Sequence, residues 1–229
     1  TDIVFQVGPP GRAVPAQVGV RYSYPGRAGN GTGTIAITNG TFRGYLTDLQ
    51  VGANLWDMIR TSTGILDLRG AAIAPLDISG DAYIGATTAS NLNGYGFVYL
   101  PAASASIARD LVVGDAFLPS RGLLELFGTT LQVGRTLEVR PSGVVTTHVG
   151  TSSCGLFVLS GITNDLRIAA GGVIRLRFEA DPASTAVAHY GFRMAGQQVS
   201  FLQGFTNAGL IALDTSGLSP ANAAAAGVY

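Results

Sequence analysis

The sequence predicts an all-β solenoid with short capping helices near the C-terminus. Three observations lead to this fold class: five inexact repeats of strand-like runs, a glycine before the first run of each repeat, and alternation of apolar with polar side chains. Inexact repeats of about 20 to 50 residues that contain short strands are typical of solenoids. We therefore expect one stack in which each repeat contributes two or three strands.

The repeats are marked by glycine. Gly33, Gly64, Gly96, Gly122 and Gly155 precede the first runs, so successive repeats begin 31, 32, 26 and 33 residues apart by subtraction. Second runs follow at residues 49–52, 76–79, 111–114, 131–134 and 166–169. Over residues 131–139 every second side chain is apolar in each strand-like run, which indicates strands with one buried face.

Three regions are expected along the chain. Residues 1–32 contain a strand over 3–7 and capping loops rich in proline and glycine, residues 33–180 carry the solenoid repeats, and residues 181–229 form C-terminal rungs and a cap. Helical spacing predicts a short helix over 197–207, and Ser219-Pro220 followed by alanines and Gly227 predicts another. The chain begins at Thr1 without methionine, which is typical of a processed export signal or of a fragment.

Composition excludes some partners. Charged residues make up 12% of the chain, the formal net charge is zero, and the fourteen basic residues are all arginine and scattered. Nucleic acids and anionic membranes are bound by basic patches, so neither partner is expected, and no apolar run is long enough to insert into a membrane. The single cysteine, Cys154, cannot form an intrachain disulfide. We expect a small buried side chain there, with an intermolecular disulfide or a reactive thiol as alternatives.

Aspartate recurs at one place in the repeats. Asp48, Asp110 and Asp165 each stand immediately before the leucine of a second run. A ladder of calcium ions is one hypothesis, and an Asx turn that satisfies backbone N–H groups where a strand begins is the simpler one. Pro75 and Thr130 take the same place in the other repeats, and the calcium-binding nonapeptide is absent. We therefore expect Asx turns.

No catalytic, cofactor-binding or metal-binding residue is predicted. Glycoside hydrolysis needs two carboxyl groups about 5–9 Å apart, and the acids closest in sequence are expected at solvent-facing strand or turn positions. These acids are Asp67 with Asp77 or Asp81, and Asp110 with Asp115. There is also no lysine and no local cluster of arginine with several acids, as a uronate lyase would use.

Other nucleophiles and bases are sparse. His148 and His189 are the only histidines, and we expect His148 to be structural or merely exposed. Ser152, Ser153 and Cys154 match no nucleophile motif. Exposed aromatic side chains could instead bind sugars by stacking against them. The simpler interpretation is that they cover the coil ends and the loops. The candidate aromatics are Tyr22, Tyr24, Tyr45, Trp56, Tyr83, Tyr95, Tyr99 and Tyr190.

Residues 122–139 carry a resemblance to a known group. The two runs Gly122-Leu-Leu-Glu-Leu and Leu131-Gln-Val-Gly-Arg-Thr-Leu-Glu-Val139 resemble repeats of exported bacterial β-helix proteins of the autotransporter-passenger type, among them Gly/Ala-rich surface proteins of planctomycetes. Residues 178–182, 190–193 and 212–218 resemble the region that closes such passengers. The resemblance covers residues 33–229 and implies a parallel right-handed β-helix, export, and a surface or matrix role. It carries over no catalytic residue.

Together these observations predict a non-enzymatic structural protein, exported to the cell surface, an extracellular matrix or a filament. It would self-associate through the ends or edges of the solenoid, as a homo-oligomer or filament without a cofactor. The alternative is an adhesin or glycan-binding module, and the third hypothesis is a polysaccharide-active β-helix enzyme. Apolar open ends would favour assembly, an aromatic row on one face would favour glycan binding, and a cleft with paired acids would favour the enzyme.

Overall fold

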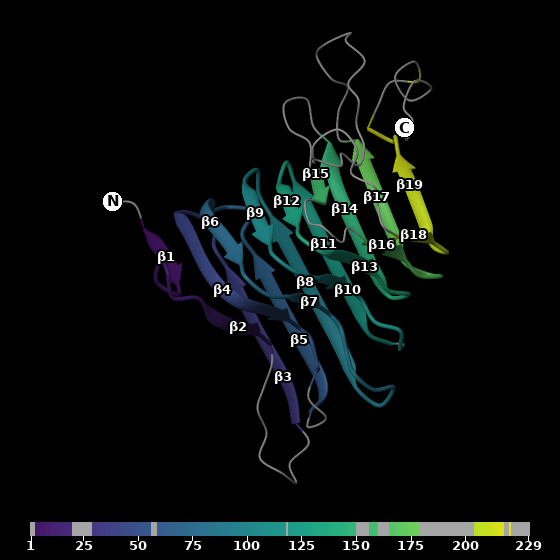
Figure 1. Ribbon diagram of the computed structural model, residues 1–229, viewed down its shortest axis with the longest axis horizontal. Helices are drawn as coiled ribbons and strands as arrows, with labels where there is room; N and C mark the ends of the chain where they lie inside the picture. Colours follow the sequence, from purple (N-terminus) through teal and green to yellow (C-terminus); the bar gives the residue numbers. More distant parts are fainter. Residues whose placement is uncertain are drawn as a thin grey trace.

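The computed structural model describes residues 3–19, 29–55, 59–117, 119–149, 156–159, 165–178, 204–217 and 220. All nineteen elements in these ranges are β-strands, and every pairing between them is parallel. The prediction of an all-β protein is therefore confirmed. Figure 1 shows the strands side by side from the purple N-terminal end to the yellow C-terminal end.

One sheet has seven strands in the order β19-β17-β14-β11-β8-β5-β3. The strands are β3 (Gly29–Ala36), β5 (Ile59–Asp67), β8 (Asn93–Leu100), β11 (Arg121–Phe127), β14 (Gly143–Val149), β17 (Val173–Phe178) and β19 (Leu210–Asp214). Since β3 and β19 are the ends of this order, each has one edge with no described strand beside it.

The other sheet has twelve strands and divides at the long strand β4 (Thr41–Val51). Residues 41–46 of β4 pair with β6, whereas residues 49–51 pair with β7. The first arm continues from β6 (Ala72–Ile78) through β9 (Ser104–Ile107) and β12 (Thr130–Val133) to β15 (Leu156–Leu159). The second arm continues through β7 (Ala82–Ile84), β10 (Leu111–Val113), β13 (Thr136–Val139), β16 (Asp165–Ile168) and β18 (Gly204–Asn207). On the opposite side of β4 lie β1 (Val4–Val7) and β2 (Val14–Val18).

The chain visits the seven-stranded sheet, the first arm and the second arm in turn. Strands β5, β6 and β7 are followed by β8, β9 and β10, and each pairs with its counterpart one circuit later. The same succession gives β11 to β13 and β14 to β16. We call each such set of three consecutive strands a rung. Most pairs of strands in contact are therefore separated in sequence by one rung.

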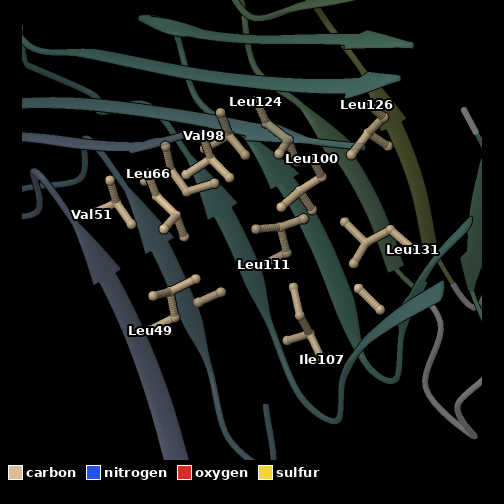
Figure 2. Packing of buried hydrophobic residues seen from close by; sticks show 14 of the residues in the cluster. Leu49, Val51, Leu66, Val98, Leu100, Ile107, Leu111, Leu124, Leu126 and Leu131 are labelled. Carbon is tan, nitrogen blue, oxygen red and sulfur yellow. The ribbon is translucent and has the colours of Figure 1, made fainter. Parts of the chain in front are cut away.

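The core lies between the two sheets. Side chains alternate along each strand, so that Val98 and Leu100 of β8 point inward while Phe97 and Tyr99 between them point outward. Figure 2 shows the inward side chains of both sheets facing one another. Complete burial of one such aliphatic side chain contributes about 1.5–3 kcal/mol. The repeated rungs therefore share one continuous apolar core.

A row of glycines crosses the seven-stranded sheet. Gly33 pairs with Gly64, Gly64 with Gly96, and Gly96 with Gly122, so four glycines predicted to begin repeats lie in register. Gly122 pairs next with Gly143, which the sequence analysis did not single out. The predicted fifth repeat was wrong, because residues 156–159 form β15 in the first arm. Gly155 itself lies outside the described residues.

The second runs divide between the two arms. Those beginning at Leu49, Leu111 and Leu166 lie in the second arm, whereas those beginning at Leu76 and Leu131 lie in the first arm. The prediction of a single set was therefore wrong. Both arms bury a leucine and then a β-branched residue two positions later, so their sequences look alike although their positions differ.

The predicted strand over 3–7 is present as β1. The helix predicted over 197–207 is wrong at its end, because residues 204–207 form β18 and pair with β16, while residues 197–203 lie outside the described residues. Backbone pairing across the stack outweighs the local helical spacing there. Of the second predicted helix, only Pro220 is described, and the predicted capping helices are not among the described elements.

Alternation along β11 can be tested with two neighbouring leucines. Leu124 is buried in the core, whereas Leu123 lies on the outer face and is half-buried. We expect Leu124→Ala to lower the free energy of unfolding by about 2–5 kcal/mol, because it leaves a cavity between the sheets. Leu123→Ala is the control and should cost clearly less. Urea unfolding monitored by circular dichroism measures both, and equal costs would contradict the assignment of the two faces.

Candidate functional site

Four aspartates and a threonine lie in register where the second-arm strands begin. The residue that follows each of them pairs with its counterpart on the next strand of the arm, so the five lie side by side. We call them the aspartate row: Asp48, Asp81, Asp110, Thr136 and Asp165. Asp48, Asp110 and Asp165 were predicted to share this place. Pro75 and Thr130 were predicted in the other two places, but the register puts them in the first arm. Asp81 was missed because alanine, rather than leucine, follows it.

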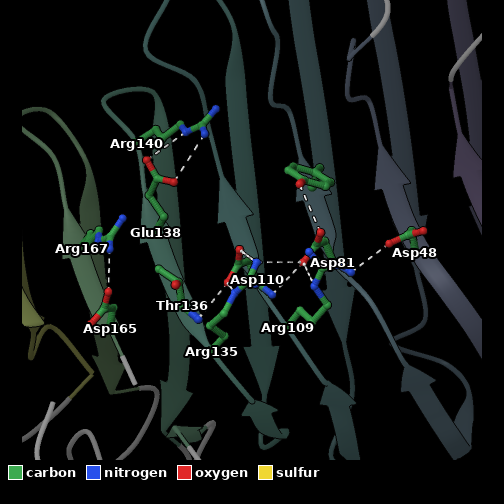
Figure 3. A network of polar contacts seen from close by, with 11 residues as sticks. Asp48, Asp81, Arg109, Asp110, Arg135, Thr136, Glu138, Arg140, Asp165 and Arg167 are labelled. Atoms are coloured by element: carbon green, nitrogen blue, oxygen red, sulfur yellow. Dashed lines mark hydrogen bonds and ion pairs between the residues drawn. The ribbon is translucent and has the colours of Figure 1, made fainter. Parts of the chain in front are cut away.

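Three carboxylates of this row bind the backbone of the next rung. Oδ1 of Asp48 accepts a hydrogen bond from the backbone N–H of Asp81 at 3.0 Å, and Oδ1 of Asp81 accepts one from Asp110 at 3.1 Å. Oδ1 of Asp110 accepts one from Thr136, also at 3.1 Å. Figure 3 shows these bonds crossing from strand to strand. The aspartates therefore satisfy backbone N–H groups, as predicted, but between rungs rather than within one Asx turn.

Two arginines pair with the carboxylates of Asp110 and Asp81 in this row. Arg135 donates Nε to Oδ1 of Asp110 at 2.6 Å and Nη2 to Oδ2 of the same carboxylate. Arg109 places Nε 3.4 Å from Oδ1 of Asp81. The hydrogen bond from Arg135 holds the pKa of Asp110 below its ordinary value. These carboxylates are therefore neutralised in place, as in a structural ladder.

In the ranges that the structure describes, no group of three or more His, Cys, Asp or Glu is arranged to hold a metal ion. Within the same part of the chain, no helix has the length and apolarity to span a membrane. A cavity of about 20 Å³ lies in the apolar core between the two sheets, and it has room for about one water molecule rather than for a substrate.

An aromatic patch lies on the outer face of the seven-stranded sheet. Tyr95, Phe97 and Tyr99 alternate along β8 and are half-buried. The guanidinium of Arg69 lies 4.6 Å from the ring centre of Tyr99, and Asp67 holds Arg69 through bonds of 2.9 and 2.6 Å. The hydrogen bond from Arg69 lowers the pKa of Asp67, while burial raises the pKa of Tyr99. The patch thus combines rings with a fixed guanidinium and carboxylate.

This aromatic patch follows a strand and not the long axis of the stack. Tyr99 pairs with Asp67 on one side and with Glu125 on the other, so no aromatic side chain continues its row in either direction. Of the other predicted aromatics, Tyr45 lies on β4 and Tyr83 on β7. Outside the described residues are Tyr22, Tyr24, Trp56 and Tyr190.

His148 is packed rather than available to a substrate. Its ring stacks on Phe127 at 3.9 Å between centroids, and Nε2 lies 3.4 Å from Oε2 of Glu125. The side chain is 5% exposed. Of the two predicted roles for His148, structural or merely exposed, the structure shows the structural one. His189, Ser152, Ser153 and Cys154 lie outside the described residues.

The acid pairs weighed for hydrolysis do not converge. Asp67 is on the seven-stranded sheet, Asp77 is on β6 of the first arm, and Asp81 belongs to the aspartate row. Asp77 accepts a hydrogen bond from Ser106 at 2.8 Å. Asp110 is bound by Arg135, and its proposed partner Asp115 is fully buried. Neither pair therefore forms an open site with two carboxyl groups.

Asp115 is an unexpected buried acid. Its backbone N–H donates to Oγ of Ser142 at 2.8 Å, and Oδ2 is hydrogen-bonded with Oγ1 of Thr87. Oδ1 is buried without a hydrogen-bond partner. The hydroxyl of Thr87 has one proton and also approaches the carbonyl oxygen of Ala89 at 3.2 Å. The sequence offered no signal for this burial, because an aspartate after Val-Gly is typical of an exposed turn.

The aspartate row predicts a loss of stability in acid. The pKa of Asp110 is lower in the folded than in the unfolded state, so at a pH between these two values the unfolded state binds more protons. The stability that the pair of Asp110 and Arg135 contributes is therefore lost as the pH falls from the unfolded pKa to the folded pKa. We expect Asp110→Asn to lower the free energy of unfolding by about 1–2 kcal/mol at pH 7. The difference from wild type should narrow below about pH 4, near the ordinary aspartate pKa.

Asp165→Asn is the matched control for this experiment, since Asp165 lies in the same row but pairs with the exposed Arg167 at 2.6 Å. Exposed pairs contribute about 0–1 kcal/mol, so this variant should change little at any pH. Urea unfolding between pH 3 and 7 measures both variants. A constant difference for Asp110→Asn across this range would contradict the ion-pair origin of its effect.

Asp115 gives a prediction of opposite sign. Asp115→Asn keeps the shape of the side chain, removes a buried charge, and supplies an amide N–H to Thr87, whose hydroxyl can then donate to Ala89. We expect the free energy of unfolding at pH 7 to rise by about 1–2 kcal/mol. Asp115→Ala should lower it, because Thr87 loses its partner and a void remains. Thermal melts of the two variants measure this, and a destabilising Asp115→Asn would show that the charge is favourable.

Comparisons with models of known protein families, with curated protein sequences and with solved structures found no match to this chain. The resemblance to exported β-helix proteins therefore stays a prediction.

Proposed function

We propose that the chain is a parallel β-helix, or β-solenoid, which acts as a non-enzymatic structural element and associates with copies of itself through the ends of its stack. The regular circuit of three parallel strands per rung supports the solenoid, because each strand pairs with its counterpart one rung later. Hydrogen bonds between rungs make such a stack stiff along its long axis. A stiff rod with adhesive ends is suited to building a filament or a surface layer.

The distribution of exposed apolar side chains carries the proposal. Among the described residues, the exposed large hydrophobic side chains all belong to the first or last strands of the stack, or stand beside them. Ile3, Val4 and Phe5 lie in or next to β1, Ile35 lies in β3 and Leu210 lies in β19. The intervening rungs bury or half-bury their large apolar side chains. Exposed apolar groups gathered in this way are typical of interaction surfaces.

Over most of their length the end strands lack the features that normally prevent edge pairing, and the register shift of β3 lies at its start, between Gly29 and Asn30. Strand β3 has the sequence Gly-Asn-Gly-Thr-Gly-Thr-Ile-Ala, without a charged residue or a proline. Strand β19 has one charged residue, Asp214, at its end. Natural edge strands are usually protected by lysine, proline or bulges, because their free N–H and C=O groups otherwise pair with another chain. These two edges are therefore suited to adding strands from a neighbour.

An exported location at the cell surface or in an extracellular matrix belongs to the same proposal. Its support comes from composition and from the resemblance, since low charge and many small residues suit a stacked protein that assembles. The second candidate function is an adhesin or glycan-binding module. The aromatic patch on β8 favours it, because half-buried rings beside a fixed guanidinium and carboxylate are a chemistry that binds sugars.

Self-association is tested with the purified chain over a hundredfold range of concentration. Analytical ultracentrifugation should show species that grow with concentration, and negative-stain electron microscopy should show rods or filaments. Because the proposed contacts are apolar and backbone-mediated, 1 M salt should leave association intact, unlike association through charged surfaces. A monomer at every concentration would overturn the proposal. Binding to immobilised polysaccharides that Tyr99→Ala abolishes would then favour the glycan-binding alternative.

A further inference from the structure

The two ends of the stack are incomplete in complementary ways. At the N-terminal end, β1 and β2 lie along β4 of the twelve-stranded sheet, while no described strand covers the outer edge of β3. Among the described strands, these two therefore form a rung without a member in the seven-stranded sheet. At the C-terminal end, β19 extends the seven-stranded sheet by one strand beyond β17. Figure 1 shows β1 and β2 at one end of the stack and β19 at the other.

We infer that β19 of one copy pairs with β3 of the next copy, so that β19 together with the neighbour's β1 and β2 completes one three-strand rung. This inference rests on the proposed function and specifies its interface. The occupant of each free edge is thus a second copy of this chain. Repetition of the contact produces a filament in which the rungs continue from one molecule into the next.

The register within each copy sets the register of the junction. Ile211 pairs with Ile174, and Ile35 pairs with Leu66, within the inward-facing row of the seven-stranded sheet. Placing β19 beside β3 brings Ile211 against Ile35 and continues this row. Inside the stack its members are almost fully buried, as Leu66 at 2% and Ile174 at 0% exposure show, whereas Ile35 is 39% exposed. The junction would bury Ile35 as its counterparts are buried.

The outward-facing row gives a second contact of the same kind. Leu210 pairs with Val173, and Thr34 pairs with Ile65, so the junction places Leu210 beside Thr34. Leu210 is 54% exposed in the isolated chain. Ala212 and Ala36 follow in the register, and two small side chains fit at the spacing of neighbouring strands, about 4.8 Å. No like charges face each other along this junction.

Strand direction limits the symmetry of the contact. Every strand pair in the described stack is parallel, and pairing β19 with β3 preserves this direction across the junction. Two like ends related by a two-fold axis would instead pair antiparallel. The inferred contact joins different surfaces of the two copies, and such heterologous contacts that do not close into a ring produce open filaments.

The test blocks one end at a time in the full chain. Ile35→Lys places a charge on the β3 edge and Leu210→Lys places one on the β19 edge, which is the device that natural edge strands use against pairing. Each variant alone should sediment as a monomer, because every junction would contain a blocked edge. An equimolar mixture should form a 1:1 dimer and nothing larger, since one intact pair of edges meets and both outer ends are blocked.

Ile65→Lys is the matched control, because Ile65 lies on the outer face of β5 inside the stack, and this variant should assemble as wild type does. Circular dichroism and thermal melts establish that each variant is folded. Thr34→Lys, on the exposed outer face of β3, replaces Ile35→Lys if that variant does not fold. Sedimentation velocity and mass photometry resolve monomer, dimer and longer species.

The outcomes separate this inference from the proposed function. A wild-type chain that stays monomeric overturns both. A wild type that assembles while either blocked variant also assembles alone leaves self-association standing and overturns the head-to-tail junction. Dimers of Ile35→Lys alone would indicate contact between two β19 ends, and dimers of Leu210→Lys alone would indicate contact between two β3 ends. Only monomeric variants that pair on mixing support the junction.

Discussion

Two rows of glycine meet along one corner of the stack, and their close approach fixes where each rung must lie. One row crosses the seven-stranded sheet at Gly64 and Gly96, and the other follows the second-arm strands at Gly52 and Gly85. Gly52 and Gly85 have φ of 56° and 67°, a conformation that side chains rarely adopt. A Cβ on Gly64 would collide with the backbone of Gly52, and one on Gly96 with the backbone of Gly85. Backbone therefore packs directly on backbone at this corner.

This corner places each strand relative to the one that faces it, while backbone hydrogen bonds set the distance between rungs. Side chains one rung apart therefore face their counterparts at the strand spacing of about 4.8 Å. The inward rows then fill the space between the sheets. The aspartate row uses the same repeat, because the carboxylate of Asp48 reaches the backbone of Asp81 and that of Asp81 reaches Asp110. These carboxylates bind the next rung, and that of Asp110 is also bound by Arg135.

The sequence contained part of this arrangement. Glycine before an alternating run located four members of the glycine row, because a position without room for Cβ tolerates no other residue. The division into two arms was hidden, since the strands that contain Leu76 and Leu111 bury similar side chains although they lie in different arms of the same sheet. Asp115 was hidden for another reason: its burial depends on Thr87 and Ser142, which come from neighbouring rungs. Contacts between rungs cannot be read from one repeat, and the contact of Arg69 with Tyr99 was missed for the same reason.

A stack of this kind has no intrinsic end. Every interior strand has partners on both sides, and each added rung buries the apolar row that the previous one left exposed. Growth stops where a charged, prolyl or bulged edge replaces the pairing surface. In β3 the register shift is confined to Gly29 and Asn30, and in β19 the charge is confined to the last residue, Asp214. The interactions that hold Ile174 between Val145 and Ile211 are the same interactions that the edge of β3 still offers at Ile35. Folding and assembly in this chain would therefore use one pairing rule, within the molecule and between molecules.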